Sequence, residues 1–225
     1  SQLYHMNGQN QWIENKAISH RKLSNNSIFY ETKPTREQLH WQITQMKLSG
    51  EPGFINAQAA RKRRADFEGV NPCAEILLRD RGLCNLTTLN VAAFIKDGRL
   101  DLEGLLEAQR LSVRSGLRMT CLELELHEWD RVQKTDRLLG VSLTGWQDAM
   151  SSLEYTVHKE AELLAQLRQV AHEEAHRYAD ELGLPHPMLI CTVKPEGTLS
   201  LLPGVSSGLH HSHSRFFVRR IRINA

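Results

Sequence analysis

The chain has 225 residues, of which 40% are hydrophobic and 24% charged, so it is long enough for one large globular domain or two small ones. Its 28 basic and 26 acidic residues nearly cancel, which argues against a chain-wide attraction to nucleic acid or to a membrane surface. No stretch reaches the roughly 20 apolar residues that cross a bilayer, and residues 1–10 do not resemble a signal peptide, so a cytoplasmic location is expected.

The first part of the chain predicts an irregular segment, a helix and a basic cluster. Residues 1–30 are polar, show no helical or strand period, and predict an irregular entry segment. Thr35 is a suitable N-cap for a helix over 36–48, which the turn residues at 49–53 would end. The stripe of this helix is Leu39, Ile43 and Met46. The basic cluster at 61–64 is typical of a solvated helix face, and no role is assigned to it.

Two longer helices and a strand are predicted further along. Asp101 can cap one helix and Thr156 another, while Met188–Val193 is a short apolar run suited to a buried strand. The residues that share a stripe are Leu102, Leu105, Leu106, Gln109 and Val113 in the first helix, and Ala161, Leu164, Leu167, Ala171, Ala175 and Tyr178 in the second. Helices that alternate with short apolar strands predict an α/β fold.

The segment 69–76 carries reactive side chains at alternate positions. If its backbone is extended, Asn71, Cys73 and Glu75 project to one side and could meet one small substrate. An amide could position that substrate, a carboxylate could move a proton, and a thiol could perform a covalent or radical step. A return strand could bring Cys84 close to the first thiol. The alternative is structural: a lone cysteine is often a small buried hydrophobe, and an Asn-Pro step is a common turn former.

The string Val-Asn-Pro-Cys-Ala-Glu-Ile over 70–76, followed by Leu-Cys-Asn-Leu-Thr over 83–87, resembles the active-site loop and return strand of ribonucleotide reductase large subunits. The resemblance implies a ten-stranded α/β barrel with the active-site cysteine on a central finger loop. Residues 1–225 would form the C-terminal part of this catalytic domain, truncated at both ends. The absence of a starting Met and an apparent strand at the end of the chain fit such an internal fragment.

The same resemblance implies roles for the four residues. Cys73 would carry a transient thiyl radical, and Cys84 would be one of two thiols that reduce the substrate and end as a redox-active disulfide. Its partner would lie on an earlier strand outside this chain. Asn71 and Glu75 would hold and deprotonate the ribose hydroxyls.

Two further stretches support the resemblance. Residues 192–200 are similar to the family's substrate-phosphate loop, and 137–145 are similar to its Arg-Arg-x-Gly-x-Gly-x-x-Gly stretch, except that Ser142 replaces a glycine. A strand followed by Gly, Thr and Ser at a helix start can present N–H groups and hydroxyls to an anion, although a simple capped turn is the alternative. The implied substrate-binding residues are Pro195, Glu196, Gly197, Thr198, Leu199 and Ser200.

The stretches 24–28, 50–54 and 204–210 look most like the adenosylcobalamin-dependent, monomeric, triphosphate-reducing group of the family. That likeness implies adenosylcobalamin as cofactor, a ribonucleotide as substrate, and thioredoxin or a similar reductant as partner. It also implies nucleotide effectors of an allosteric enzyme whose deoxyribonucleotide product serves DNA synthesis.

The remaining cysteines and histidines carry no separate site in this interpretation. Cys121 and Cys191 stand in apolar surroundings and are expected in the core. His210, His211 and His213 are expected at the surface or at the substrate's edge, with no metal site. The four tryptophans are scattered and give no base-stacking platform for nucleic acid.

Three alternatives stay open on the sequence. One is a reductase of another class that acts on diphosphates. The second is a hydrolase or transferase that uses Cys73 as nucleophile with a histidine as base. The third is a noncatalytic nucleotide-binding domain in which the cysteines are structural.

Overall fold

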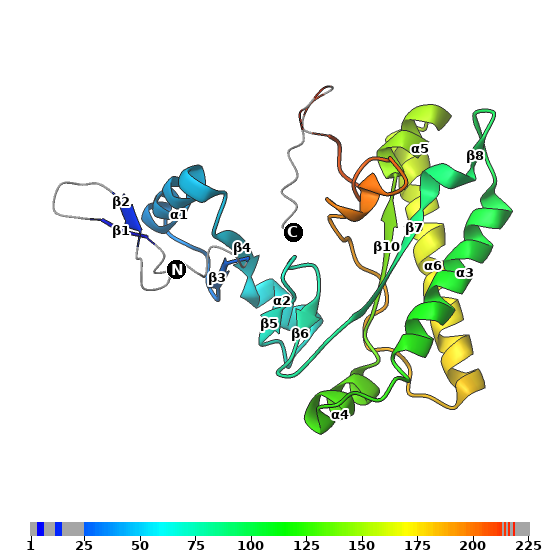
Figure 1. Cartoon of the computed structure of the whole chain (residues 1–225), viewed down its shortest axis with the longest axis horizontal. Helices are drawn as coiled ribbons and strands as arrows, with labels where there is room; N and C mark the ends of the chain where they lie inside the picture. The colour runs from blue at the N-terminus through cyan, green and yellow to red at the C-terminus, as the bar shows by residue number, and fades with distance from the viewer. Residues whose placement is uncertain are drawn as a thin grey trace, which may run out of the picture. The chain divides into compact units, whose positions relative to one another are not determined.

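The computed structural model describes residues 4–6, 12–14, 25–212, 214, 216 and 218. The chain divides into two compact units, one up to Gly82 and one from Leu83 onward (Figure 1). Each unit has its own elements and its own core.

The first unit consists of short strands and two helices. Its elements are β1 (Tyr4–Met6), β2 (Trp12–Glu14), β3 (Ser27–Tyr30), α1 (Arg36–Ser49), β4 (Gly53–Asn56), α2 (Ala57–Arg63), β5 (Gly69–Val70) and β6 (Leu77–Leu78). β1 pairs with β2 and β5 with β6 in antiparallel fashion, while β3 and β4 are parallel. The expectation of an irregular segment over 1–30 is therefore wrong for β1, β2 and β3. Strands of three or four residues are too short to show a period of two, and a neighbouring strand stabilises them.

Helix α1 begins where the sequence predicts and ends one residue later than predicted, at Ser49. Thr35 forms a capping box with Gln38, and Gly50 ends the helix in the left-handed conformation with φ 79°. The predicted apolar stripe is wrong in part, because Ile43 is 47% exposed while Gln42 is fully buried. Gln42 accepts a hydrogen bond from the Tyr30 hydroxyl at 2.6 Å and donates to the carbonyls of Pro52 and Gly53 at the start of β4. Its buried amide is thereby satisfied.

The basic cluster at the end of α2 is only partly solvated. Arg61 is exposed and pairs with Glu31 at 2.8 Å, as a surface ion pair does. Arg64 is 2% exposed, and it donates to Asp66 at 2.8 Å and to the Leu77 carbonyl at 3.1 Å. The expectation of a solvated face is wrong for Arg64, which links α2 to β6.

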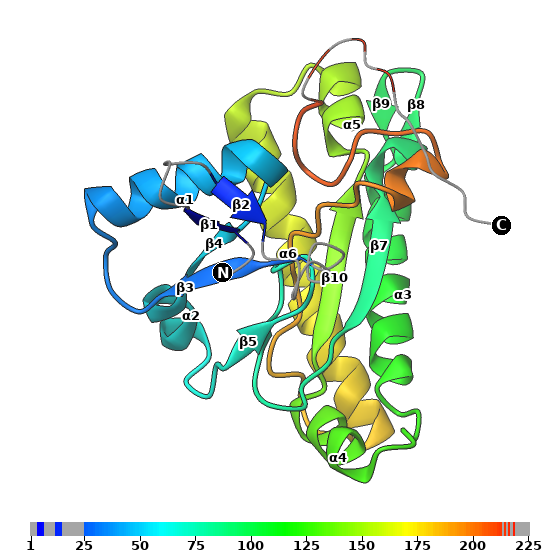
Figure 2. The ribbon, with the colours of Figure 1, turned by 60° about the vertical axis from the view of Figure 1, so that its left-hand side comes forward.

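The second unit is an α/β arrangement around parallel strands (Figure 2). Its elements are β7 (Asn85–Asn90), the 3₁₀ helix η2 (Val91–Phe94), β8 (Ile95–Lys96), β9 (Arg99–Leu100), α3 (Leu102–Met119), α4 (His127–Asp136), β10 (Leu139–Thr144), α5 (Trp146–Leu153), α6 (Val157–Leu182) and the 3₁₀ helix η3 (Leu199–Leu201). β7 and β10 are parallel, with Leu86 opposite Gly140. A third parallel segment joins β10 through the Val141–Cys191 bridge. The α/β prediction is confirmed, and the sheets of the described residues do not close into a barrel.

Helices α3 and α6 have the predicted N-caps. The Asp101 carboxylate accepts from the Gly104 N–H at 3.0 Å, Thr156 caps α6, and Gly183 ends it with φ 64°. One face of the sheet packs on α3 and α6 through two core clusters that contain Val141 and Leu143. None of the helices in the described part of the chain is both long and apolar enough to span a bilayer.

The third strand segment is less buried than its sequence suggests. Ile190 is 3% exposed, but Met188 is 50% and Val193 62% exposed. The prediction of a buried strand over 188–193 is therefore correct for its centre only. The segment lies beside β10 alone among the described strands, so its other side has no strand to cover it.

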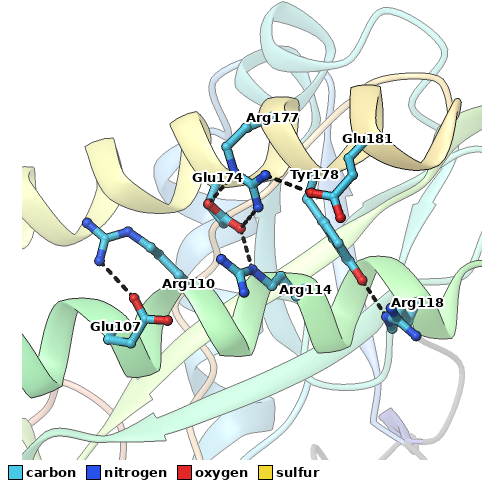
Figure 3. Close-up of polar contacts among 8 residues, drawn as sticks. All are labelled: Glu107, Arg110, Arg114, Arg118, Glu174, Arg177, Tyr178 and Glu181. Atoms are coloured by element: carbon cyan, nitrogen blue, oxygen red, sulfur yellow. Dashed lines mark hydrogen bonds and ion pairs between the residues drawn. The ribbon is translucent and has the colours of Figure 1, made fainter.

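An ion network joins α3 to α6 (Figure 3). Glu174 on α6 is 5% exposed and receives hydrogen bonds from Arg177 at 2.6 Å and from Arg114 on α3 at 2.5 Å. Arg177 also bonds Glu181 at 2.7 Å, and Arg118 donates to the Tyr178 hydroxyl. The guanidinium groups of Arg177 and Arg114 hold the pKa of Glu174 below its usual value.

Candidate active site

The Cys73 segment is a turn at the end of the β5–β6 hairpin. The Ala74 N–H donates to the Asn71 carbonyl at 2.9 Å, and Ala74 has φ 64°. The expected extended backbone over 71–75 is therefore wrong. Proline fixes φ in the range that the second position of a β-turn needs, and asparagine is favoured at the first position. Cys73 is exposed on this turn, so it is not a buried hydrophobe.

Asn71 organises the turn with its own side chain. Its Oδ1 accepts from the Ile76 N–H at 2.9 Å, while Asn25 Nδ2 donates to the Pro72 carbonyl at 2.5 Å. Within the described residues the Nδ2 group of Asn71 makes no such bond, so it is the donor that Asn71 can offer to a ligand. Both carboxylate oxygens of Glu75 are buried.

A cavity of about 700 Å³ adjoins this turn within the first unit. It is lined by Asn25, Asn26, Ser27, Phe29, Gly69, Val70, Asn71 and Pro72. The cavity is large enough for a ligand of nucleotide size. Its amide-rich wall suits a ligand with several hydroxyl groups, because an amide can both donate and accept.

Cys84 lies at the start of β7, on the face of the sheet that faces away from α3. Alternation places Cys84, Leu86, Thr88 and Asn90 on one face. Thr87 lies on the opposite face, where it accepts a hydrogen bond from Ser112 of α3 at 2.9 Å. We call the face with Cys84 the polar face.

Gly140 on β10 makes room for Cys84. A Cβ at Gly140 would stand 3.1 Å from Cys84 Sγ and 2.3 Å from a methyl carbon of Leu86. A side chain at this position would displace both groups, so the glycine of the 137–145 stretch has a steric reason. Gly145 is also required, because its φ is 67° and a Cβ there would stand 2.6 Å from Asn90 Oδ1.

The predicted anion loop lies across the carboxyl ends of β7 and β10 (Figure 2). Its start is fixed where the Lys194 N–H donates to Ser142 Oγ at 3.0 Å. Ser142, which replaces the family's glycine, is 1% exposed and so has a structural use in this chain. The expected helix start is only the three-residue 3₁₀ helix η3.

The six residues of the loop differ in exposure. Pro195, Gly197, Thr198 and Leu199 are exposed, whereas Glu196 is 3% and Ser200 0% exposed. The exposed Gly197–Leu199 stretch is therefore the part that can meet a ligand. Glu196 and Ser200 lie beneath it, and Ser200 Oγ is 2.9 Å from Ser207 Oγ.

A second cavity, of about 330 Å³, lies beside the loop in the second unit. Thr88, Asn90, Thr144, Leu199, Leu202 and Pro203 line it. Thr88, Asn90 and Thr144 were not among the predicted site residues. The signal available for them was the polar residue at every second position toward the ends of β7 and β10.

The other cysteines and histidines differ partly from expectation. Cys121 and Cys191 are exposed, so their assignment to the core is wrong. Cys121 follows the end of α3, and Cys191 lies on the third strand segment; neither position is covered by a further layer of the described chain. His210 and His211 are exposed, and His213 lies outside the described residues, as does the apparent strand at 220–225.

The structure therefore brings the site residues together in two groups. Asn71, Cys73 and Glu75 share one turn of the first unit. Cys84 and the 195–200 loop belong to the second unit. Parallel strands with one helix-covered face, one polar face and a loop across the strand ends define an α/β domain, and domains of this class commonly bind their ligands at the ends of the strands.

Comparison with known proteins specifies this class. A family model described as "Ribonucleotide reductase, barrel domain" matches residues 3–189. The chain belongs to the ribonucleotide reductase barrel-domain family. It is 34% identical over 184 residues to a putative adenosylcobalamin-dependent ribonucleoside-triphosphate reductase of Mycobacterium phage D29, covering 78% of this chain and 27% of that protein.

A second relative and a solved structure agree with this family. The adenosylcobalamin-dependent ribonucleoside-triphosphate reductase of Lactobacillus acidophilus is 28% identical, over 93% of this chain and 32% of its own length. The crystal structure of a B12-dependent class II ribonucleotide reductase has a TM-score of 0.74 at 24% identity, over 87% of this chain and 31% of that chain, and shows the shared fold. The chain thus spans about a third of the length of the relatives it matches.

Proposed function

We propose that this chain is part of the catalytic barrel of a ribonucleotide reductase that converts ribonucleoside triphosphates to deoxyribonucleotides with adenosylcobalamin. The observation that carries the proposal is the β5–β6 turn, where one short segment holds an exposed thiol with an amide and a carboxylate. Family membership and the activities for which the relatives are named support the activity, the triphosphate substrate and the cofactor. They favour this function over a hydrolase that uses Cys73 as nucleophile.

In the proposed reaction, a thiyl radical on Cys73 takes the hydrogen atom from C3′ of the ribose. Glu75 accepts the proton of the 3′-hydroxyl, and the Asn71 amide donates to a ribose hydroxyl. The 2′-hydroxyl leaves as water. Cys84 and a second thiol outside this chain supply two electrons and two hydrogens and become a disulfide; one hydrogen completes the departing water and the other is added at C2′. Glu75 returns its proton to the 3′-oxygen, and Cys73 returns the hydrogen atom to C3′, which leaves the thiyl radical on Cys73 again.

Adenosylcobalamin, when bound, supplies the radical equivalent that starts this sequence. The chain's own residues fit that requirement, because Cys73 is a free thiol on an exposed turn. The described protein holds this thiol in position through the Asn71 and Asn25 hydrogen bonds at 2.9 and 2.5 Å.

The proposal also requires the two groups of site residues to meet around one substrate. Cys73 would lie on a central finger loop of a ten-stranded barrel, close to Cys84 on the first strand of the second unit. The exposed Gly197–Leu199 stretch would hold the substrate's phosphates with backbone N–H groups and the Thr198 hydroxyl. We further propose thioredoxin or a similar reductant as electron donor, nucleotide effectors as regulators, and the cytoplasm as the place of action.

The test uses the complete reductase that contains these residues. Cys73→Ser should abolish formation of deoxyribonucleotide while the ribonucleotide still binds, because serine keeps the shape of the turn and cannot carry the radical. Cys121→Ser changes another exposed cysteine, in the second unit; it is the matched control and should keep normal turnover. Normal turnover by the Cys73→Ser enzyme would contradict the proposal.

A second measurement separates the substrate classes. Turnover of ribonucleoside triphosphates and diphosphates is compared in the same enzyme, with and without adenosylcobalamin. Activity on triphosphates that requires the cofactor is the expected result. Activity on diphosphates without it would place the chain in another class of reductase.

A further inference from the structure

Glu196 is a negative charge inside a loop that is proposed to bind an anion. Its side chain is 0% exposed, although the next three residues are exposed. A carboxylate directed toward a phosphate would repel it. Instead, Glu196 Oε1 accepts a hydrogen bond from the Thr88 hydroxyl of β7 at 2.5 Å (the loop and β7 are seen in Figure 2).

The backbone at Glu196 is held in an uncommon conformation. Its φ is 55°, in the left-handed region that residues other than glycine rarely adopt. The Glu196 carbonyl accepts from the Ser200 N–H at 3.1 Å and so closes the loop over the buried carboxylate. Such a conformation persists only where surrounding contacts hold it.

Few contacts are available to hold the carboxylate. Lys194 Nζ lies 3.6 Å from Oε1, and Oε2 is buried and makes no hydrogen bond within the described residues. The Thr88 hydroxyl therefore supplies the short hydrogen bond to this charge. A hydrogen bond to a buried charged group is stronger than a neutral one, and its loss leaves the charge poorly solvated.

We propose that Thr88 and Glu196 are a positioning pair that fixes the Gly197–Leu199 stretch relative to the reducing thiol Cys84. Thr88 and Cys84 lie on the same polar face of one strand, so the bond ties the phosphate-binding stretch to the strand that carries the thiol. Neither side chain touches the substrate in this proposal, which rests on the proposed reductase function. The pair sets where the phosphates sit while Cys84 meets the ribose.

The experiment measures kcat and KM for a ribonucleoside triphosphate in the complete reductase. Thr88→Val and Glu196→Ala should each raise KM by about tenfold, the factor that corresponds to one hydrogen bond to a charged group. Thr88→Ser and Glu196→Gln keep a donor and an acceptor and should stay close to the wild type. Thr87→Val, the same change one residue away on the helix-covered face, should leave KM unaltered.

The double variant distinguishes a pair from two separate roles. If Thr88 and Glu196 act through their mutual bond, Thr88→Val combined with Glu196→Ala should raise KM no more than either change alone. If the double variant raises KM by the product of the two single increases, the pair is overturned. A Thr88→Ser enzyme with a KM as high as that of Thr88→Val would overturn it too. Should Thr88→Val fail to fold in a thermal melt, the comparison of Glu196→Gln with Glu196→Ala decides, and equal KM values for the two would also overturn it.

The wild-type enzyme separates this inference from the proposed function. A wild type that forms no deoxyribonucleotide would overturn both. A wild type that does so, with every variant at Thr88 and Glu196 unchanged, would overturn the positioning pair alone.

Discussion

Single atoms decide much of the site's geometry. Gly140 has no side chain, and this leaves room for Cys84 Sγ. The alternating polar residues around position 72 suggest a strand, but the proline there favours the turn that is observed. The Thr88 hydroxyl donates to the buried carboxylate of the predicted anion loop. These effects come from one group each and can be tested one at a time.

Gly140→Ala should destabilise the protein by about 1–3 kcal/mol, because the new methyl group would stand 2.3 Å from Leu86 Cδ2. Urea unfolding of the two proteins measures the difference. Gly116→Ala in α3 is the matched control: its Cβ would stand 3.5 Å from Leu139, an ordinary contact, and alanine is the better helix former. The control should be neutral or stabilising; equal losses for both would contradict the steric explanation.

The Cys191 thiol should react slowly despite the exposure of its residue. Burial around the thiol raises its pKa to about 11, so little thiolate forms near neutral pH. At pH 8, iodoacetamide should alkylate it roughly two orders of magnitude more slowly than a free cysteine of pKa about 8.5, and the rate should still rise between pH 9 and 10. Mass spectrometry of a variant that keeps only this cysteine gives the rate. A plateau below pH 9 would contradict the raised pKa.

At the scale of elements, buried charge holds α3 against α6. Glu174 lies between the two helices, and Arg114 and Arg177 approach it from α3 and α6 (Figure 3). Removing one partner of a buried ion pair lowers the stability more than removing one partner of a surface pair, because the charge that remains is buried without an opposite charge. The two kinds of pair occur side by side on α3, where Glu107 and Arg110 are both substantially exposed.

Glu174→Gln should lower the free energy of unfolding at pH 7 by about 2 kcal/mol, the range of a hydrogen bond to a charged group. The lowered pKa of Glu174 gives the sign of the pH dependence: its contribution is complete above pH 4.5, the ordinary value, and is lost as pH falls through the lowered value in the folded protein. The variant should therefore show a weaker loss of stability below pH 4.5. Glu107→Gln is the control. Denaturation curves from pH 3 to 7 should give this variant the same free energy of unfolding as the wild type.

At the scale of the whole molecule, the two units differ in their cores. The second has two clusters of buried apolar residues around β10, all six residues of which are buried, while the cluster of the first unit consists of Ala57, Ala60 and Phe67. Stability against local opening follows the amount of buried apolar contact. The unit that carries Cys73 is thus the one with less internal packing.

Hydrogen exchange can measure that difference. Amides of β10 should exchange most slowly in the described chain, and those of β3 to β6 should exchange faster because their small core permits local opening. Peptide-level mass spectrometry on the complete protein resolves the two regions. Equal protection of both units would show that the first gains its stability from contacts beyond its own core.

Much of the fold and the family followed from the sequence. Helices α1, α3 and α6 begin after the N-caps Thr35, Asp101 and Thr156, and α1 and α6 end at glycines; all of these residues act on the backbone within a few positions. The ordered motifs around Cys73 and Cys84 identified the family, and the family model confirmed it. Local signals suffice where the interacting groups are neighbours in the chain.

The tertiary structure alone decided which polar groups are buried and what they hold. Gln42, Arg64 and Glu196 have polar or charged side chains of kinds that are mostly exposed. Each is buried because its partner comes from another element: Tyr30, Leu77 and Thr88. A hydrogen-bond partner distant in sequence leaves no local pattern, because it is the folded backbone that brings the two groups within bonding distance. The same reason explains why the sequence could name Glu196 as a loop residue but could not show that its carboxylate faces the strand of Cys84.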